Sequence, residues 1–243
     1  ETVKCAYKDF VRAAKPKQSL FALIPKKKAV KKPAKKAKKT AKKTPKTLVK
    51  KAAKPAKKKA APRTRSAKPK GPPERLGVLE IAGNPATIIG GDVVVGQTAP
   101  EFTAQANNWS ILQGLASTAG KVRVLAAVPS LSTSVCDKET RTFNERAAEL
   151  GEDIRVMVIS TDLPATQKLW CGNAGVDRVQ TVSDHQDMSF GISYGTYIKE
   201  RRYHRRAVFV VDRNDKVTYV AYMPVLGVEP NYDEVLAAAK AAL

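Results

Sequence analysis

Residues 122–136 read VRVLAAVPSLSTSVC, and they are the most informative part of the sequence for the fold class. Its first seven residues are apolar apart from one arginine, the pattern of a strand buried on both faces of a sheet. Residues 137–150 then carry apolar side chains at i, i+4 and i+7 among charges, which predicts an amphipathic helix. A buried strand therefore passes directly into a helix, and Cys136 lies at the junction. This order is typical of an α/β domain.

The position of Cys136 favours reactivity. The first turn of a helix offers unpaired backbone N–H groups and the positive end of the helix dipole, and both stabilise a thiolate relative to a thiol. Thr133, three residues earlier, is able to bring its hydroxyl beside that sulfur. Cys136 is therefore a candidate nucleophile. A free cysteine is also a common small residue of a buried core, and position alone does not decide between these interpretations.

A second cysteine, Cys171, ends the segment 163–171, which reads LPATQKLWC. The segment places Pro164 where a first helical residue is expected and is followed by Gly172, so a short helix over 164–171 is predicted. It comes after another buried-strand pattern, IRVMVI at 154–159. Cysteines on successive helices after successive strands either approach each other or are separate core residues. The pattern leaves both possibilities open.

The sequence around both cysteines resembles that of a known protein family. Pro129, Thr133 and Cys136 match the P-x-x-x-T-x-x-C signature of peroxiredoxins. The longer strings PSLSTSVCDKETRTFNE and VISTDLPATQKLWCGNAG are similar to the thiol peroxidases, the atypical two-cysteine peroxiredoxins. The likeness runs from about Leu76 to the C-terminus and includes FGISYGTYI, RAVFVVDRNDKVTYVAYMP and EPNYDEVLAAAK.

The resemblance implies a role for each of five residues. Cys136 would be the peroxidatic cysteine, which attacks the peroxide and becomes a sulfenic acid. Cys171 would be the resolving cysteine of the same chain, which condenses with that sulfenic acid to an intramolecular disulfide. Thr133 would hydrogen-bond the peroxide and the thiolate, and Arg206 would stabilise the thiolate and the transition state. Pro129 would shield the pocket. The resemblance also implies hydroperoxide substrates, thioredoxin as reductant and a homodimer.

Two features of this chain affect how the family's residue roles apply to it. Arg205 precedes Arg206, and because strand side chains alternate, only one of the two faces the pocket. The segment 199–205, KERRYHR, is shorter and more basic than the family's usual loop, which leaves the preference among peroxides open. The mechanism needs no cofactor or metal: His185 and His204 stand alone, outside any ligand spacing.

The rest of the pattern predicts one α/β domain over residues 76–243, with a thioredoxin-like (peroxiredoxin) fold behind a leading β-hairpin. Strands are expected at 77–81, 86–89, 122–128, 154–160, 207–212 and 217–223. Helices are expected at 134–150, 164–171, 188–194 and 232–242.

The first 75 residues have a different composition. They hold 28 Lys and Arg against 3 acids, a net charge of +25, whereas residues 76–243 hold 16 against 19, a net charge of −3. Between residues 26 and 70 there are 22 basic residues, no acid and repeated prolines. Such a segment cannot bury enough apolar surface to offset its ordering entropy, so residues 1–75 are predicted to be a disordered basic tail.

The tail resembles the C-terminal tails of linker histones in composition. A flexible chain of this charge density binds polyanions by counterion release, without reading their sequence. DNA is the expected partner, with RNA, polyphosphate and anionic membrane surfaces as competitors. The apolar run 20–24 is too short for a signal peptide or a membrane span, and a mechanism that needs regenerated thiols suits a reducing cytoplasm. The tail adds nucleoid association to that expectation. Cys5 is expected to have no part in the chemistry.

Two classes of function remain compatible with the sequence. The first is a thioredoxin-dependent peroxidase whose tail localises it. The second is a polycationic DNA-binding protein whose domain has become a redox sensor. The four residues Thr133, Cys136, Cys171 and Arg206 are all present, which favours the peroxidase.

Overall fold

A computed structural model describes residues 71–243. The predicted tail lies outside the described residues, apart from its last five positions. Strand β1 begins at Glu74, slightly ahead of the predicted domain start at Leu76.

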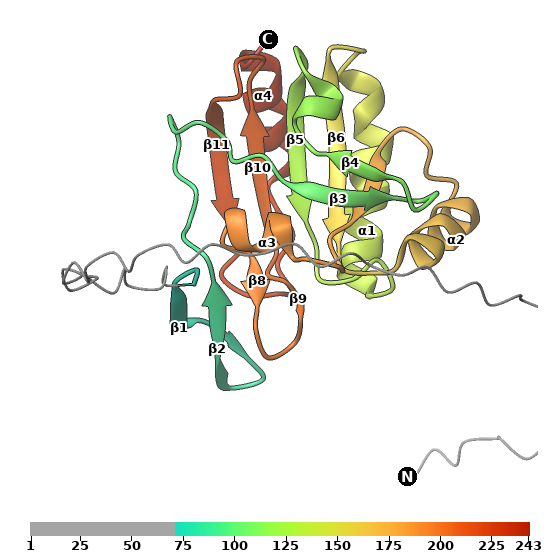
Figure 1. The fold of residues 1–243 in the computed structure, drawn as a ribbon. Helices are drawn as coiled ribbons and strands as arrows, with labels where there is room; N and C mark the ends of the chain where they lie inside the picture. Colours follow the sequence, from blue (N-terminus) through green and yellow to red (C-terminus); the bar gives the residue numbers. More distant parts are fainter. Residues whose placement is uncertain (1–70) are drawn as a thin grey trace, which may run out of the picture. The chain divides into compact units, whose positions relative to one another are not determined.

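The centre of the domain is a seven-stranded sheet in the order β11-β10-β5-β6-β7-β3-β4 (Figure 1). β5, β6 and β7 run parallel, and the other neighbours pair antiparallel. The strands are β3 (Thr103–Ala106), β4 (Ile111–Gln113), β5 (Val122–Ala127), β6 (Ile154–Ser160), β7 (Gln180–Ser183), β10 (Ala207–Val211) and β11 (Val217–Tyr222). Parallel strands joined by helices confirm the predicted α/β class.

The helices are α1 (Ser134–Arg146), α2 (Pro164–Ala174), α3 (Ser189–Ser193) and α4 (Tyr232–Ala241). The side chains of β5 show which helices lie on each face of the sheet. Val122, Val124 and Ala126 face a core that is shared with α1, α2 and α4. Leu125 and Ala127 face a second core, which contains side chains of α3. The strand is buried on both sides because successive side chains alternate between those two cores.

The predicted leading hairpin is present and larger than expected. β1 (Glu74–Ile81) and β2 (Asn84–Ile89) pair antiparallel, and β8 (Tyr197–Ile198) and β9 (Tyr203–His204) extend them to a second, four-stranded sheet. The basic segment that separates β8 from β10 thus includes a short strand.

The end of α2 differs from the prediction. The helix continues through Gly172 to Ala174 and stops at Gly175, whose φ of 66° lies in the left-handed region. Its N–H donates to the carbonyl of Cys171, the usual glycine cap. Cys171 is therefore inside the helix, one turn before its end. The predicted helix over 134–150 likewise ends early, since α1 stops at Arg146 and a 3₁₀ turn follows.

No helix among residues 71–243 is long and apolar enough to cross a membrane.

Candidate active site

Two donors converge on the sulfur of Cys136. The residue lies in the first turn of α1 and is fully buried. Thr133 is the N-cap residue of α1, but its hydroxyl does not cap the helix; its Oγ1 lies 2.9 Å from Cys136 Sγ. Arg206 Nη2 donates to the same sulfur over 3.2 Å. A thiolate at this position would therefore receive one neutral and one charged hydrogen bond.

Arg206 is itself held by two further contacts. Its side chain is 1% exposed, Nε donates to the carbonyl of Leu226 over 3.1 Å, and Nη1 pairs with Glu139. Glu139 is fully buried, and its second oxygen finds no hydrogen-bond partner among residues 71–243. The guanidinium thus bridges a buried carboxylate and a buried sulfur, which fixes its direction.

Glu139 was not predicted as a site residue, although the sequence carries a signal for it. The buried face of α1 consists of Cys136, Glu139, Thr140 and Phe143. These residues follow the i, i+3, i+4, i+7 spacing of one helix face. An acid on the apolar face of an amphipathic helix needs a buried partner, so the pattern itself pointed to a cation opposite Cys136.

Arg205 and Arg206 point to different neighbourhoods, as strand alternation requires. Arg205 donates from Nε to Gly195 O over 2.9 Å, pairs with Asp92 and lies 3.9 Å above the ring centroid of Tyr222. These contacts tie the segment between β2 and β3 to the sheet. The structure thus places Arg206, and not Arg205, on the cysteine.

The sulfur lies beneath a cleft of about 250 Å³ with a mainly apolar wall. The lining residues are Pro129, Ser130, Thr133, Ser134, Val135, Tyr203, Arg206, Leu226 and Gly227. Tyr203 comes from β9, so the short basic loop contributes to the cleft. Pro129, a predicted site residue, is buried in this wall.

Asp162, which no sequence motif indicated, fixes the loop before Cys136. Its carboxylate accepts hydrogen bonds from Ser130 Oγ (2.7 Å), Leu131 N (2.8 Å) and Ser160 Oγ (2.8 Å). Three donors on one carboxylate hold the end of β6 against the loop that follows β5.

Cys171 occupies a different environment. Its side chain is partly exposed, its sulfur lies 3.3 Å from Thr181 Oγ1, and Asn107 Nδ2 is 4.0 Å away. It lines a separate hollow of about 380 Å³, which shares no residue with the cleft over Cys136. Both cysteines are free thiols in this structure. A disulfide requires a sulfur separation near 2.05 Å, so its formation needs the two sulfurs to approach each other.

The two helices are linked beside the cysteines. Asp137 follows Cys136, and its carboxylate accepts from Trp170 Nε1 (3.0 Å) and Arg141 Nε (2.9 Å). Trp170 precedes Cys171, and Arg141 also donates to the carbonyl of Ala174 at the end of α2 over 2.9 Å. We call Asp137, Arg141 and Trp170 the α1–α2 clasp.

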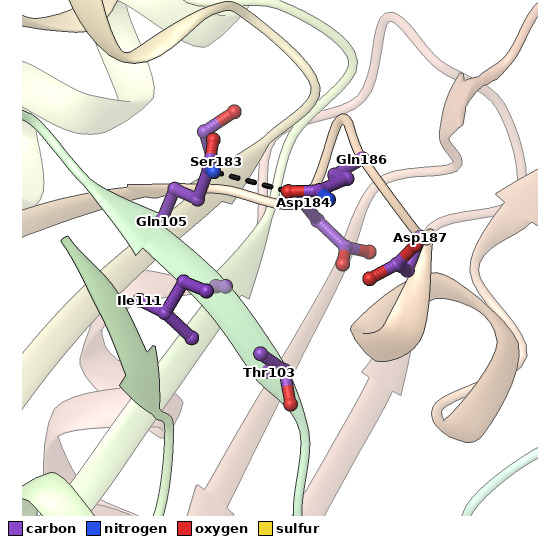
Figure 2. Close-up of a pocket in the computed structure, with 8 residues that line it drawn as sticks. Thr103, Gln105, Ile111, Ser183, Asp184, Gln186 and Asp187 are labelled. Atoms are coloured by element: carbon purple, nitrogen blue, oxygen red, sulfur yellow. Dashed lines mark hydrogen bonds between the residues drawn. The ribbon is translucent and has the colours of Figure 1, made fainter. Parts of the chain in front are cut away.

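A third pocket contains neither cysteine. Figure 2 shows Asp184 and Asp187 across from Thr103 and Gln105 of β3, around a volume of about 50 Å³. Burial raises the pKa of Asp184 to about 7, and its oxygens accept from the backbone N–H groups at the start of α3. These bonds anchor α3, which is a structural role.

The two histidines stay apart from the cysteines. His204 is fully buried, burial lowers its pKa to about 3, and its Nε2 lies 3.6 Å from Asp184. His185 Nδ1 contacts Ser183 Oγ at 2.9 Å. Within residues 71–243 no group of three or more His, Cys, Asp and Glu side chains could hold a metal ion.

Comparisons with known proteins identify the fold and the family of this chain. Residues 94–236 match the family described as Redoxin. A peroxiredoxin-like protein from Aquifex aeolicus aligns over 68% of this chain and 96% of its own, with a TM-score of 0.61 and 37% identity. A thiol peroxidase from Chromobacterium violaceum gives a TM-score of 0.60 at 15% identity over 67% of this chain and 95% of its own, a likeness of fold alone. The chain therefore has the thioredoxin-like fold of the peroxiredoxins.

Sequence relatives narrow the class. The thiol peroxidase of Halalkalibacterium halodurans is 49% identical over 165 residues, which cover 68% of this chain and 98% of the relative. That of Bacillus subtilis is 49% identical over 163 residues, 67% of this chain and 96% of the relative. The chain belongs to the thiol peroxidase family, the peroxidases that reduce peroxides at the expense of thiols.

Proposed function

We propose that this chain reduces hydrogen peroxide and organic hydroperoxides through Cys136 and Cys171, and that thioredoxin reduces the resulting intrachain disulfide. The observation that carries the proposal is the convergence of Thr133 Oγ1 and Arg206 Nη2 on Cys136 Sγ beneath an open cleft. A peroxide needs an available thiolate and donors for the departing oxygen, and this arrangement supplies both.

The cycle balances without a cofactor. The Cys136 thiolate attacks one peroxide oxygen, the O–O bond breaks, and the second oxygen leaves as an alcohol or water after taking a proton. The Cys171 thiol then attacks the sulfur of the sulfenic acid and releases water, which leaves a Cys136–Cys171 disulfide. The thioredoxin dithiol returns both cysteines to thiols and becomes a disulfide.

The geometry supports a catalytic or structural role for each of the other side chains around Cys136. Arg206 carries a fixed positive charge beside the sulfur, where negative charge moves from sulfur to oxygen during attack. The Thr133 hydroxyl has one hydrogen and two acceptors within reach, Cys136 Sγ and Ser130 O at 3.1 Å. It is therefore able to release the sulfur and to contact the peroxide instead. Pro129 keeps water from the buried side of the cleft.

The test is peroxide turnover with thioredoxin, thioredoxin reductase and NADPH, run on the full chain and on residues 76–243. We expect the same rate from both, because the cleft is built entirely from residues after 128. The curated relatives are covered over nearly their whole length by the C-terminal part of the chain, which supports testing it separately. A full chain that forms the disulfide but does not turn over would favour the redox-sensor alternative.

The basic segment supports a second function. Residues 26–70 carry 22 positive charges and no negative ones, so we propose that the full chain binds duplex DNA without sequence preference and lies in the cytoplasm at the nucleoid. The logarithm of the binding constant should fall linearly with the logarithm of salt concentration, by about 0.9 for each phosphate neutralised.

Gel-shift titration at several salt concentrations checks this second function. Residues 76–243, at a net charge of −3, should give no shift. Binding to anionic vesicles but not to DNA at low salt would replace the nucleoid by a membrane surface. The homodimer that the resemblance implies is part of the proposal and is checked by light scattering.

A further inference from the structure

An exposed tryptophan lies close to the resolving cysteine. Trp109, in the turn between β3 and β4, is 51% exposed and has a φ of 69°. A positive φ is rare for a bulky aromatic residue. Such backbone strain persists only where the surroundings impose it, and it gathers at functional sites. The peroxide chemistry at Cys136 makes no use of this residue.

Trp109 forms one wall of an open groove. The β3–β4 turn lies beside α2 (Figure 1), and between them is a hollow of about 700 Å³ whose apolar lining includes Trp109 and Leu169. Leu169 is 66% exposed, so the groove presents its apolar side chains to solvent. The groove shares Asn107 and Asn108 with the hollow over Cys171, so the two adjoin.

The chemistry of disulfide reduction selects Cys171 as the sulfur that is attacked. Cys136 is fully buried, whereas Cys171 is partly exposed in the hollow that adjoins the groove. Attack on Cys171 expels Cys136 as the thiolate, and that thiolate recovers the hydrogen bonds from Arg206 and Thr133. A better-stabilised leaving thiolate makes thiol–disulfide exchange faster.

We propose that the groove formed by Asn107–Trp109 and Lys168–Leu169 is the docking surface for the protein dithiol that reduces this enzyme; the proposal rests on the disulfide cycle proposed above. Charge complementarity supports this occupant. Among the described residues that line the groove, Lys168 is the only charged side chain, and the attacking group is an anionic thiolate. Aromatic residues are enriched in the cores of protein interfaces, and the groove is far wider than a small thiol needs.

The exchange then has two balanced steps. One thiolate of the docked protein dithiol, here called the reductant, attacks Cys171 Sγ. The Cys136–Cys171 bond breaks, and Cys136 leaves as a thiolate. The second thiol of the reductant loses its proton and attacks the mixed disulfide. This attack releases the Cys171 thiolate and leaves the reductant as a disulfide. The Cys171 thiolate then takes up a proton.

The experiment compares a protein reductant with a small one. Full-chain Trp109→Asn, Leu169→Ser and Lys168→Glu, singly and combined, are assayed with thioredoxin, thioredoxin reductase and NADPH, and separately with dithiothreitol. Asparagine adopts positive φ readily, so Trp109→Asn removes the ring without adding strain. Leu76→Ser is the matched control, because Leu76 is 71% exposed on β1 and lines neither hollow.

We expect the combined variant to raise the KM for thioredoxin at least tenfold, with an unchanged rate in dithiothreitol and an unchanged control. An unchanged KM for thioredoxin would overturn the docking surface. So would an equal loss with dithiothreitol, or a change of oligomeric state, which would make a second copy of this chain the occupant. A wild-type chain that fails with dithiothreitol would instead refute the proposed disulfide cycle itself.

Discussion

The two cysteines lie one helix apart in sequence and in opposite kinds of environment. Cys136 is fully buried, begins a helix and has a charged donor on its sulfur. Cys171 is partly exposed and lies one turn before the end of a helix, and the hydrogen-bond partners of its sulfur among residues 71–243 are the neutral Thr181 and Asn107. The buried sulfur is thus the one with a charged donor that stabilises negative charge.

The same contrast separates the two arginines before β10. Arg206 contacts the sulfur of Cys136, whereas the buried Arg205 pairs with the partly exposed Asp92 and lies over the ring of Tyr222. Adjacent residues of one type thus have different neighbours, because their side chains point to opposite sides of the chain.

The sharpest test of the contrast is to remove each sulfur. Cys136→Ser should abolish peroxide reduction, because an alkoxide is not available at neutral pH where a thiolate is. Cys171→Ser should complete one rapid turnover and then stop at the sulfenic acid, which further peroxide over-oxidises. Stopped-flow peroxide consumption with mass spectrometry of the product distinguishes the two. Equal behaviour of both variants would remove the division of labour.

The next test replaces each of the two arginines by methionine. Arg206→Met should lower the second-order rate with peroxide by about 10²–10³, the usual loss of a donor to developing charge. Arg205→Met should keep a rate near that of wild type while its melting temperature falls, since it removes the hydrogen bond to Gly195 O and the cation from the ring of Tyr222. Rates are normalised to the folded fraction measured by circular dichroism. A normal rate in Arg206→Met would leave the role of this arginine without support.

A smaller effect is expected at the α1–α2 clasp. Trp170→Phe keeps an aromatic side chain and removes the N–H that binds Asp137, so α1 and α2 are held together less tightly. One hydrogen bond contributes about 1 kcal/mol, so disulfide formation should accelerate about fivefold. The readout is the rate of disulfide formation after one equivalent of peroxide, followed by rapid thiol alkylation and mass spectrometry. Lys138→Ala, which breaks only an exposed ion pair of α1, is the control and should change nothing. Slower disulfide formation would mean that the clasp guides Cys171 instead of restraining it.

The sequence predicted the long buried strands because their apolar runs are continuous. β3, β4, β7, β8 and β9 were not predicted, since they have two to four residues and little apolar pattern. The predicted end of α2 was wrong because a glycine after a helical pattern usually marks a stop, and Gly172 does not. Gly172 is not among the glycines with a positive φ, so its backbone continues the helix, and Gly175 provides the positive φ of the cap.

The residues of the candidate site differ in the same way in how well the sequence predicted them. Thr133 and Cys136 are three residues apart, so local helix geometry was enough to place them together. Glu139 is 67 residues from Arg206, and Trp170 is 33 residues from Asp137. Such contacts depend on how elements pack, which local periodicity does not contain. The resemblance to peroxiredoxins supplied Arg206, and nothing in the local pattern supplied Asp162 or the clasp.

We propose that Cys136 and Cys171 of one chain perform the two halves of one reaction. The decisive measurement maps the disulfide after the reduced full-length protein receives one equivalent of peroxide. Peptide mass spectrometry under non-reducing conditions should find Cys136 linked to Cys171, with the intact mass of a single chain. A linkage through Cys5, or a disulfide between two chains, would contradict the account.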